Sequence, residues 1–264
     1  HALQKGDVNK VVPIDKSSTI LTIFLALIFL HEGLTWAKFG CVCLIAAGTF
    51  MMISRKEVTE STKKKESSWF VYAVLSAVFA SLTAILGKIG ISVIDSNLGT
   101  AIRTTVVLVM AWLMVFIKGK QQEVRKIEKK ELMFIGLSGI ATGASWLCYF
   151  KALQLGNVNK VTPIDKSSTI LTMLLAFIFL REEITWLKFA AMVLIGAGTY
   201  MMIQKKETED KKEDKKWLIY ALGSAVFASL TSILGKVGMQ DINSNLGTAI
   251  RTVVVLIMAW IVVF

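Results

Sequence analysis

Long hydrophobic runs alternate with short charged segments along the whole chain. The runs carry almost no ionisable residues, and each is about the length that an α-helix needs to cross a hydrocarbon core of roughly 30 Å. In the middle of the chain the runs cover residues 69–87, 98–117, 132–150, 161–180 and 186–203. This pattern predicts five consecutive transmembrane helices.

Two parts of the chain are written twice. The sequence that starts at Ala2 returns at Ala152, and the sequence that starts at Trp69 returns at Trp217. A fixed period along a chain indicates repeated structural units. Transporter folds are commonly built from two copies of one helical unit.

The repeats divide the chain into one complete unit and two partial ones. Residues 69–203 are predicted to form the complete five-helix unit, residues 1–54 the last two helices of a preceding unit, and residues 217–264 the first two helices of a following unit. Charged linkers at 55–68 and 204–216 separate them. The sequence therefore predicts nine transmembrane helices. Because the chain begins and ends inside a unit, we expect it to be a segment of a longer protein.

We expect an all-α membrane protein, a multi-pass helical bundle in which successive units are inverted. Five crossings place the linkers 55–68 and 204–216 on opposite sides of the membrane. The connector 118–131 lies on the same side as linker 55–68 and is rich in Lys and Arg, which favours this side as cytoplasmic.

The amino-acid composition limits the classes of partner that we expect for this chain. Hydrophobic residues fill 54% of 264 positions, more than the usual share in a soluble domain. The net charge of +11 comes largely from the connectors, where basic residues meet anionic lipid headgroups. We therefore expect a lipid bilayer and a small-molecule substrate as partners, and no nucleic acid. The cysteines and histidines show no metal-ligand spacing, so no metal or cofactor is expected. No nucleophile–base arrangement indicates an enzyme.

Ionisable residues inside the hydrophobic runs are the candidates for a binding site, because such residues are costly in a membrane and tend to face a bundle interior. On the predicted topology five of them gather in one leaflet: Lys88, Arg103, Lys151, Asp165 and Lys166. Four cations and one carboxylate fit an anion, or a zwitterion whose amine meets the carboxylate. In the alternative interpretation, the long Lys and Arg side chains extend to water at the membrane interface, and Asp165 and Lys166 satisfy each other as a pair. We favour that interpretation for Lys88 and Lys151.

Further candidates surround this group. Trp146 and Tyr149 end the third helix and either form a pocket wall or anchor it at the interface. Thr169 either lines a polar path or bonds to its own helix. Pro163 is predicted to open the fourth helix; if the helix starts earlier, the proline breaks it. The inverted mate would supply an equivalent cluster, composed of Asp15, Lys16, Lys236 and Arg251.

Four segments together resemble the EamA domain of the drug/metabolite transporter superfamily: SAVFASLTAILGKIGI, NLGTAIRTTVVLVMAW, SGIATGASWLCYFKALQLG and VTPIDKSSTILTMLLAFIFLREEITWLKFAAMVLIGAGTYMMI. The likeness is greatest to the small bacterial and archaeal members with one five-helix unit. The resemblance implies a ten-helix inverted-repeat assembly, made by two units in one chain or by a homodimer of single units. It also implies transport of small metabolites by alternating access in the bacterial or archaeal plasma membrane.

The sequence leaves three functions open. The first is a secondary transporter, an exporter or exchanger, of a small anionic or zwitterionic metabolite. The second is a multidrug exporter of organic cations, which needs a carboxylate in the middle of the membrane. No such carboxylate stands in the middle of a run, and Glu32 and Glu182 lie at helix ends. The third is a membrane scaffold subunit without transport activity.

Overall fold

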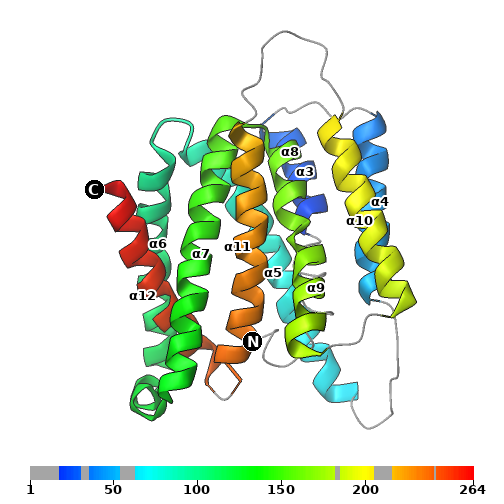
Figure 1. Cartoon of the computed structure of the whole chain (residues 1–264). Helices are drawn as coiled ribbons and strands as arrows, with labels where there is room; N and C mark the ends of the chain where they lie inside the picture. Colours follow the sequence, from blue (N-terminus) through cyan, green and yellow to red (C-terminus); the bar gives the residue numbers. More distant parts are fainter. Residues whose placement is uncertain (1–17, 31–35, 54–62, 182–184, 205–215, 241) are drawn as a thin grey trace.

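The computed structural model describes residues 18–30, 36–53, 63–181, 185–204, 216–240 and 242–264. The elements are α3 (Ser18–Phe29), α4 (Trp36–Ile53), α5 (Lys63–Gly90), α6 (Ser96–Ile117), the short 3-10 helix η2 (Gln121–Lys126), α7 (Lys129–Leu155), α8 (Val158–Lys166), α9 (Ser168–Leu180), α10 (Trp186–Gln204), α11 (Lys216–Gly238) and α12 (Ser244–Val263). Figure 1 shows these helices side by side in one bundle.

The predicted all-α membrane fold is confirmed. Within the part of the chain that the structure describes, five helical spans are long and apolar enough to cross a membrane: Ser96–Ile117, Lys129–Leu155, Val158–Leu180, Lys216–Gly238 and Ser244–Val263. Shorter apolar helical segments lie in α3, α4, α5 and α10. Each hydrophobic run of the sequence therefore falls on a helix, because a backbone in lipid must satisfy its own hydrogen bonds.

Polar residues define the starts of α6 and α7. The Asp95 carboxylate accepts a hydrogen bond from the backbone N–H of Asn97 at 2.8 Å and caps α6. Glu128 and Glu131 form a capping box at the start of α7. Such caps satisfy N–H groups that have no partner within the helix. The caps therefore fix the turn before α6 and the end of the connector before α7.

The fourth helix of the complete unit differs from its prediction. We expected Pro163 to open this helix, and that expectation is wrong: α8 begins at Val158 and Pro163 lies inside it. Val158 and Val161 are fully buried in the cluster that joins α5, α7 and α11, so packing extends the helix before the proline. The alternative was a helix that starts earlier and is broken by the proline; the earlier start is observed, but α8 continues through Pro163 to Lys166. The break between α8 and α9 falls at Ser167, whose N–H donates to the Pro163 carbonyl at 2.9 Å.

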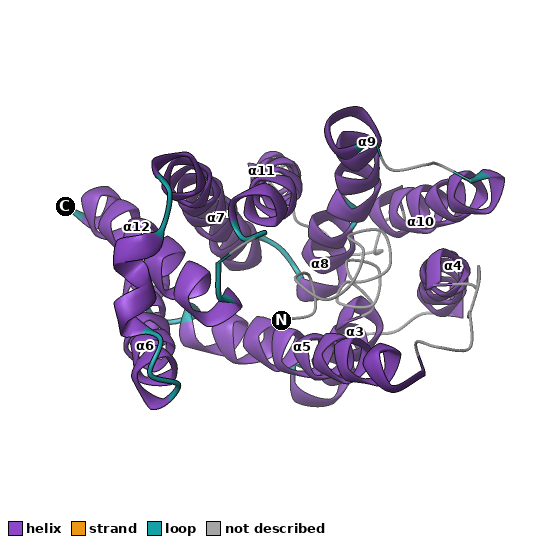
Figure 2. Ribbon diagram, turned by 90° about the horizontal axis from the view of Figure 1, so that it is seen from below, coloured by secondary structure: helices purple, strands orange, loops and turns teal. Residues whose placement is uncertain are grey.

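The repeated units interlock. The closest helix pairs are α7 with α11, α4 with α10, and α6 with α12, and each pair joins helices that the sequence assigns to different units. The last two pairs each join the two copies of one repeated sequence. Figure 2 shows the result from below, with α4 beside α10 and α7 beside α11. At each of these pairs, a helix of one unit therefore packs directly against a helix of the next.

Repeat-related helices run in opposite directions. In Figure 1, α5 begins at the lower end of the bundle, whereas α11, which carries the same repeated sequence, begins at the upper end. This arrangement agrees with the odd number of crossings predicted for one unit.

Glycines allow the closest approaches. A Cβ atom at Gly139 would lie 2.7 Å from the Cβ of Val254 on α12, and one at Gly143 would lie 2.9 Å from the sulfur of Met258. Between α4 and α10, a Cβ at Gly48 would lie 2.9 Å from the carbonyl oxygen of Ala191. Small residues at these contacts are typical of helix association in lipid, where dispersion contacts provide the attraction.

Candidate substrate-binding site

Arg103 lies against an aromatic wall. This residue comes from the second turn of α6, and its guanidinium carbon lies 3.7 Å from the centre of the Trp146 ring on α7. The same carbon is 5.7 Å from the ring of Phe150. The Trp146 and Phe150 rings are stacked, with centroids 5.6 Å apart. A cation on the face of an aromatic ring is stabilised by about 0.5–2 kcal/mol, which holds the guanidinium in place while its N–H groups can bind an anion.

Asp165 provides the opposite charge from α8. Its side chain is 7% exposed, and its carboxylate accepts a hydrogen bond of 2.5 Å from the hydroxyl of Ser224 on α11. Ser145 of α7 donates to the backbone carbonyl of Ser224 at 3.1 Å, which fixes α11 against α7. Short O–H···O⁻ bonds of this kind are among the stronger hydrogen bonds in proteins. The carboxylate is therefore positioned by two other helices.

Tyr149 lies within electrostatic range of both charges. It is buried, and the Asp165 carboxylate and the Arg103 guanidinium both act on its phenol group. Its ring also packs edge-on against Trp146, with centroids 6.2 Å apart. Within the described residues, neither Arg103 nor Asp165 forms an ion pair. The candidate site thus consists of one cation, one carboxylate and two aromatic side chains, and we call Arg103, Asp165, Trp146 and Tyr149 the Arg103–Asp165 site.

Lys88 and Lys151 lie at the end of the bundle and bind backbone and side-chain oxygens there. The ammonium group of Lys88 donates to the carbonyl oxygens of Leu153 and Gly156, at the C-terminal end of α7. Cations are favoured at helix C-termini, where carbonyl groups lack partners. Lys151 donates to Gln154 at 3.0 Å, and its ammonium lies 3.9 Å from the Asp95 carboxylate.

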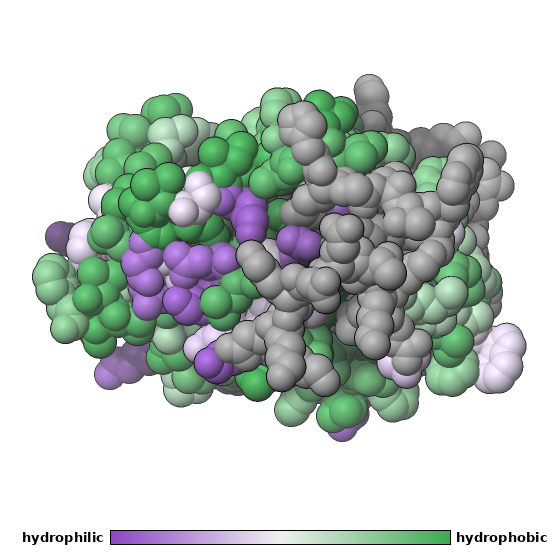
Figure 3. Space-filling view, turned by 90° about the horizontal axis from the view of Figure 1, so that it is seen from above, coloured by the Kyte–Doolittle hydropathy of each residue, from purple (hydrophilic) through white to green (hydrophobic). Residues whose placement is uncertain are grey.

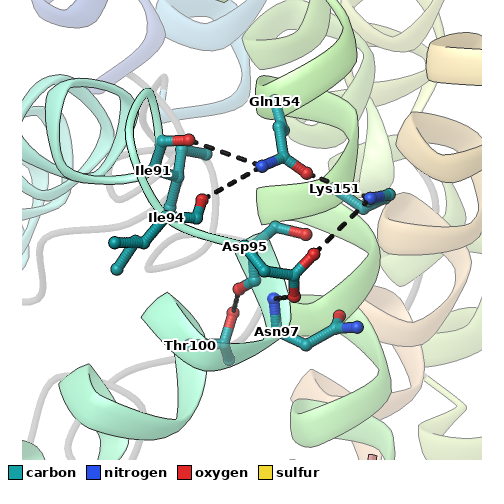
Figure 4. A network of polar contacts seen from close by, with 8 residues as sticks. Ile91, Ile94, Asp95, Asn97, Thr100, Lys151 and Gln154 are labelled. Atoms are coloured by element: carbon teal, nitrogen blue, oxygen red, sulfur yellow. Dashed lines mark hydrogen bonds and ion pairs between the residues drawn. The ribbon is translucent and has the colours of Figure 1, made fainter. Parts of the chain in front are cut away.

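Figure 4 shows how this network ties α7 to the turn between α5 and α6: Lys151 lies between Gln154 and Asp95, and Gln154 donates to the Ile94 carbonyl at 3.1 Å. Seen from this end, in Figure 3, hydrophilic surface gathers toward the middle with hydrophobic surface around it. The contacts of Lys88 and Lys151 are those of residues that stabilise a helix end at the membrane interface.

Lys166 faces a different part of the bundle from Asp165. It lines a small cavity together with Thr169, between α8–α10 and the pair α3 and α4. The Thr169 hydroxyl donates to the Lys166 carbonyl at 2.8 Å. Successive residues of a helix point about 100° apart, so Asp165 meets α11 while Lys166 meets α3 and α4. Within the described residues these neighbours in sequence form no ion pair with each other.

The predicted mate cluster is only partly described. Asp15 and Lys16 lie outside the described residues. Lys236 and Arg251 are half-buried on α11 and α12. A guanidinium nitrogen of Arg251 would lie 3.6 Å from a Cβ atom at Gly235, so this side chain packs against α11.

Ser224 is the contact that the sequence did not single out. It lies in the following unit, and only the packing of α11 on α7 brings it to Asp165. A hydroxyl within a row of small residues, Ala221, Ser224 and Ala225, was the available signal, since such a row marks the buried face of a helix.

A comparison with known protein families identifies the family of this chain. The model of the EamA-like transporter family matches residues 1–54 and 67–204. This chain belongs to the EamA-like transporter family. Together with the apolar helices, this membership makes the chain a membrane transporter.

A curated relative agrees with this assignment. The chain is 39% identical over 135 residues to a Sinorhizobium protein described as an uncharacterized transporter in the cobO 3′ region. The match covers 51% of this chain and 96% of the relative, so the relative is about as long as the one complete unit predicted here. No solved structure matches this chain.

Proposed function

We propose that this EamA-family transporter carries a small zwitterionic metabolite across the membrane by alternating access. The observation that carries the proposal is that Arg103 and Asp165 both act electrostatically on the buried Tyr149, with neither charge in an ion pair among the described residues. Unpaired charges are costly inside a membrane bundle, and a zwitterion compensates both at once.

The two ends of the substrate have separate partners. The Arg103 guanidinium, whose face packs on Trp146, is free to bind a carboxylate in two-pronged geometry, which arginine favours. The Asp165 carboxylate binds the amine, and Tyr149 and Trp146 enclose the part between. Of the anionic and zwitterionic substrates that the sequence leaves open, a buried carboxylate beside the arginine favours the zwitterion, because it repels a simple anion.

The mechanism follows from the inverted repeats. A bundle of two oppositely oriented halves that rocks about a central site exposes that site first to one side and then to the other. Asp165 on α8 is held by Ser224 on α11, which belongs to the following unit. Substrate binding at the Arg103–Asp165 site is therefore coupled to the contact between units. We place the protein in the plasma membrane of a bacterium or archaeon.

Export of organic cations is a weaker alternative. Asp165 is a buried carboxylate of the kind such an exporter needs, but the Trp146 face that would hold a cation is already covered by Arg103 at 3.7 Å. A positive charge in the same site disfavours a second cation.

The test is counterflow exchange in proteoliposomes with labelled pools of zwitterionic, anionic and cationic metabolites. We expect exchange of a zwitterion. Arg103→Gln and Asp165→Asn should each lower its exchange roughly 10- to 100-fold, as expected when a hydrogen bond to a charged group is lost. Asp165→Asn should also shift preference toward carboxylates that lack an amine.

Arg125→Gln is the matched control, because Arg125 is an exposed arginine outside the transmembrane helices. It should exchange at the rate of the parent protein. Correctly inserted Arg103→Gln and Asp165→Asn proteins with full exchange would refute the site. Exchange of cations alone would support the exporter, and an absence of exchange for every pool would support the scaffold.

A further inference from the structure

A second cavity lies away from the Arg103–Asp165 site, where the two copies of the fourth and fifth helices of the repeat meet. Its walls come from α3, α4, α8, α9 and α10 and the junction between α8 and α9. The lining residues are Thr19, Ile45, Thr49, Pro163, Lys166, Ser167, Thr169, Ile195 and Thr199. The space open to the centre of a water molecule is about 10 Å³, enough for roughly one water or an ion of similar size. We call it the repeat cavity.

The walls of the repeat cavity are made twice by the same sequence. Thr19 and Thr169 occupy equivalent positions of the two copies, and so do Ile45 and Ile195, and Thr49 and Thr199. Because the copies come from different units, an occupant of this cavity contacts both units at once. Its binding therefore depends on the contact between the two units.

One hydroxyl in the wall lacks a partner. Thr199 is 6% exposed, and its hydroxyl forms no hydrogen bond with the described residues. Its equivalent, Thr49, donates to the carbonyl of Ile45 at 2.8 Å. A hydroxyl in a transmembrane helix usually bonds to its own helix in that way, and an unsatisfied buried hydroxyl costs on the order of 1–3 kcal/mol. The hydroxyl of Thr199 is therefore available to an occupant of the cavity.

The charge of the lining favours an anion. Among the described residues that line the cavity, Lys166 is the one charged residue and none is a carboxylate. The neighbouring carboxylate, Asp165, is hydrogen-bonded to Ser224 on another face of α8. Within the described residues, Lys166 takes part in no ion pair. A cation in a membrane bundle tends to acquire a counter-charge, and hydroxyl groups can donate to the same anion.

We propose that the repeat cavity binds one small monatomic anion, of which chloride is the example to test, held by Lys166 and the hydroxyl of Thr199. The site is separate from the substrate site and joins the two units through the bound ion. Ile45 and Ile195 supply apolar parts of its lining, and the space of about 10 Å³ favours a monatomic ion over larger polyatomic anions.

The experiment measures the thermal unfolding of the purified full chain in sodium chloride, choline chloride and sodium gluconate at equal ionic strength. A ligand that binds only the folded state raises the Tm as its concentration rises. We expect both chloride salts to raise the Tm by at least a few degrees over gluconate, with saturation in a chloride titration. A rise in both sodium salts would indicate a cation site and overturn the proposal. Equal Tm in all three salts would indicate water alone and would also overturn it.

Substitutions of the proposed ligands test whether chloride binds in the repeat cavity. Lys166→Met should abolish the chloride-dependent rise, and Thr199→Val, which keeps the shape of the side chain, should move the midpoint of the titration several-fold higher. Thr104→Val is the matched control, because the hydroxyl of Thr104 on α6 bonds to the Thr100 carbonyl of its own helix at 2.7 Å. It should keep the full effect. If Lys166→Met does not fold, Thr199→Val still decides: an unchanged midpoint in that variant would contradict the proposed position.

Discussion

At the scale of single residues, the carboxylate of Asp165 depends on a hydroxyl from another unit. The 2.5 Å hydrogen bond from the Ser224 hydroxyl orients this buried group, and Arg103 is oriented in a comparable way by Trp146. Each charge of the site thus owes its position to a residue on a different helix. Transport should therefore be sensitive to residues that never touch the substrate.

Ser224→Ala tests this dependence. The substitution removes the donor to Asp165, and we expect substrate affinity in the exchange assay to fall roughly 10-fold, the size expected for a hydrogen bond to a charged group. Ser232→Ala on the same helix is the control, because that hydroxyl donates to the Ala228 carbonyl of α11 itself at 3.1 Å. Equal affinities for the two variants would mean that Ser224 does not position the carboxylate.

At the scale of elements, the hydrophobic pattern predicted the helices well because length and apolar composition are local properties. The juxtaposition of Arg103 with Trp146 also agrees with a sequence argument, since the start of the second helix and the end of the third share one side of the membrane. The start of α8 was missed because Val158 and Val161 are buried by distant helices, and such packing overrides the preference of Pro163 for a first turn.

The sequence also did not reveal that the side chains of Asp165 and Lys166 face different helices. Adjacent charges suggest one site, but the rotation of the helix sends them to different neighbours. Ser224 was missed for a related reason: its partner lies in another unit, and only the packing of α11 on α7 brings them together.

The contact between α7 and α12 gives a prediction at this scale. In Gly139→Ala the new methyl group would lie 2.7 Å from the Cβ of Val254 and 3.1 Å from the Arg251 carbonyl oxygen, so α12 must move. We expect a loss of roughly 1–3 kcal/mol, visible as a Tm lower by at least a few degrees. Thermal unfolding followed by size-exclusion chromatography measures it.

Gly136→Ala is the control on the same helix, because a Cβ atom there meets nothing within 4 Å. It should keep or raise the Tm, since alanine is the better helix former. A decrease of the same size in both variants would show that the loss of glycine in α7, rather than the approach of α12, is responsible.

At the scale of the whole molecule, the account rests on two oppositely oriented copies of one sequence. The opposite directions of α5 and α11 (Figure 1) place the starts of these two helices at opposite ends of the bundle. Both linkers are rich in lysine, so the positive-inside tendency acts on both and only one of them can follow it. Alternating access requires this inversion, because the two copies must present equivalent gates to opposite compartments.

Cysteine accessibility measures the inversion directly. On a background in which Cys41, Cys43 and Cys148 are replaced by serine, Ser61→Cys reports on the first linker and Thr208→Cys on the second. Labelling of intact cells with a membrane-impermeant maleimide should modify Thr208→Cys, whereas Ser61→Cys should react only after the membrane is opened. Modification of both linkers from the same compartment would contradict the inverted arrangement and, with it, the alternating-access mechanism.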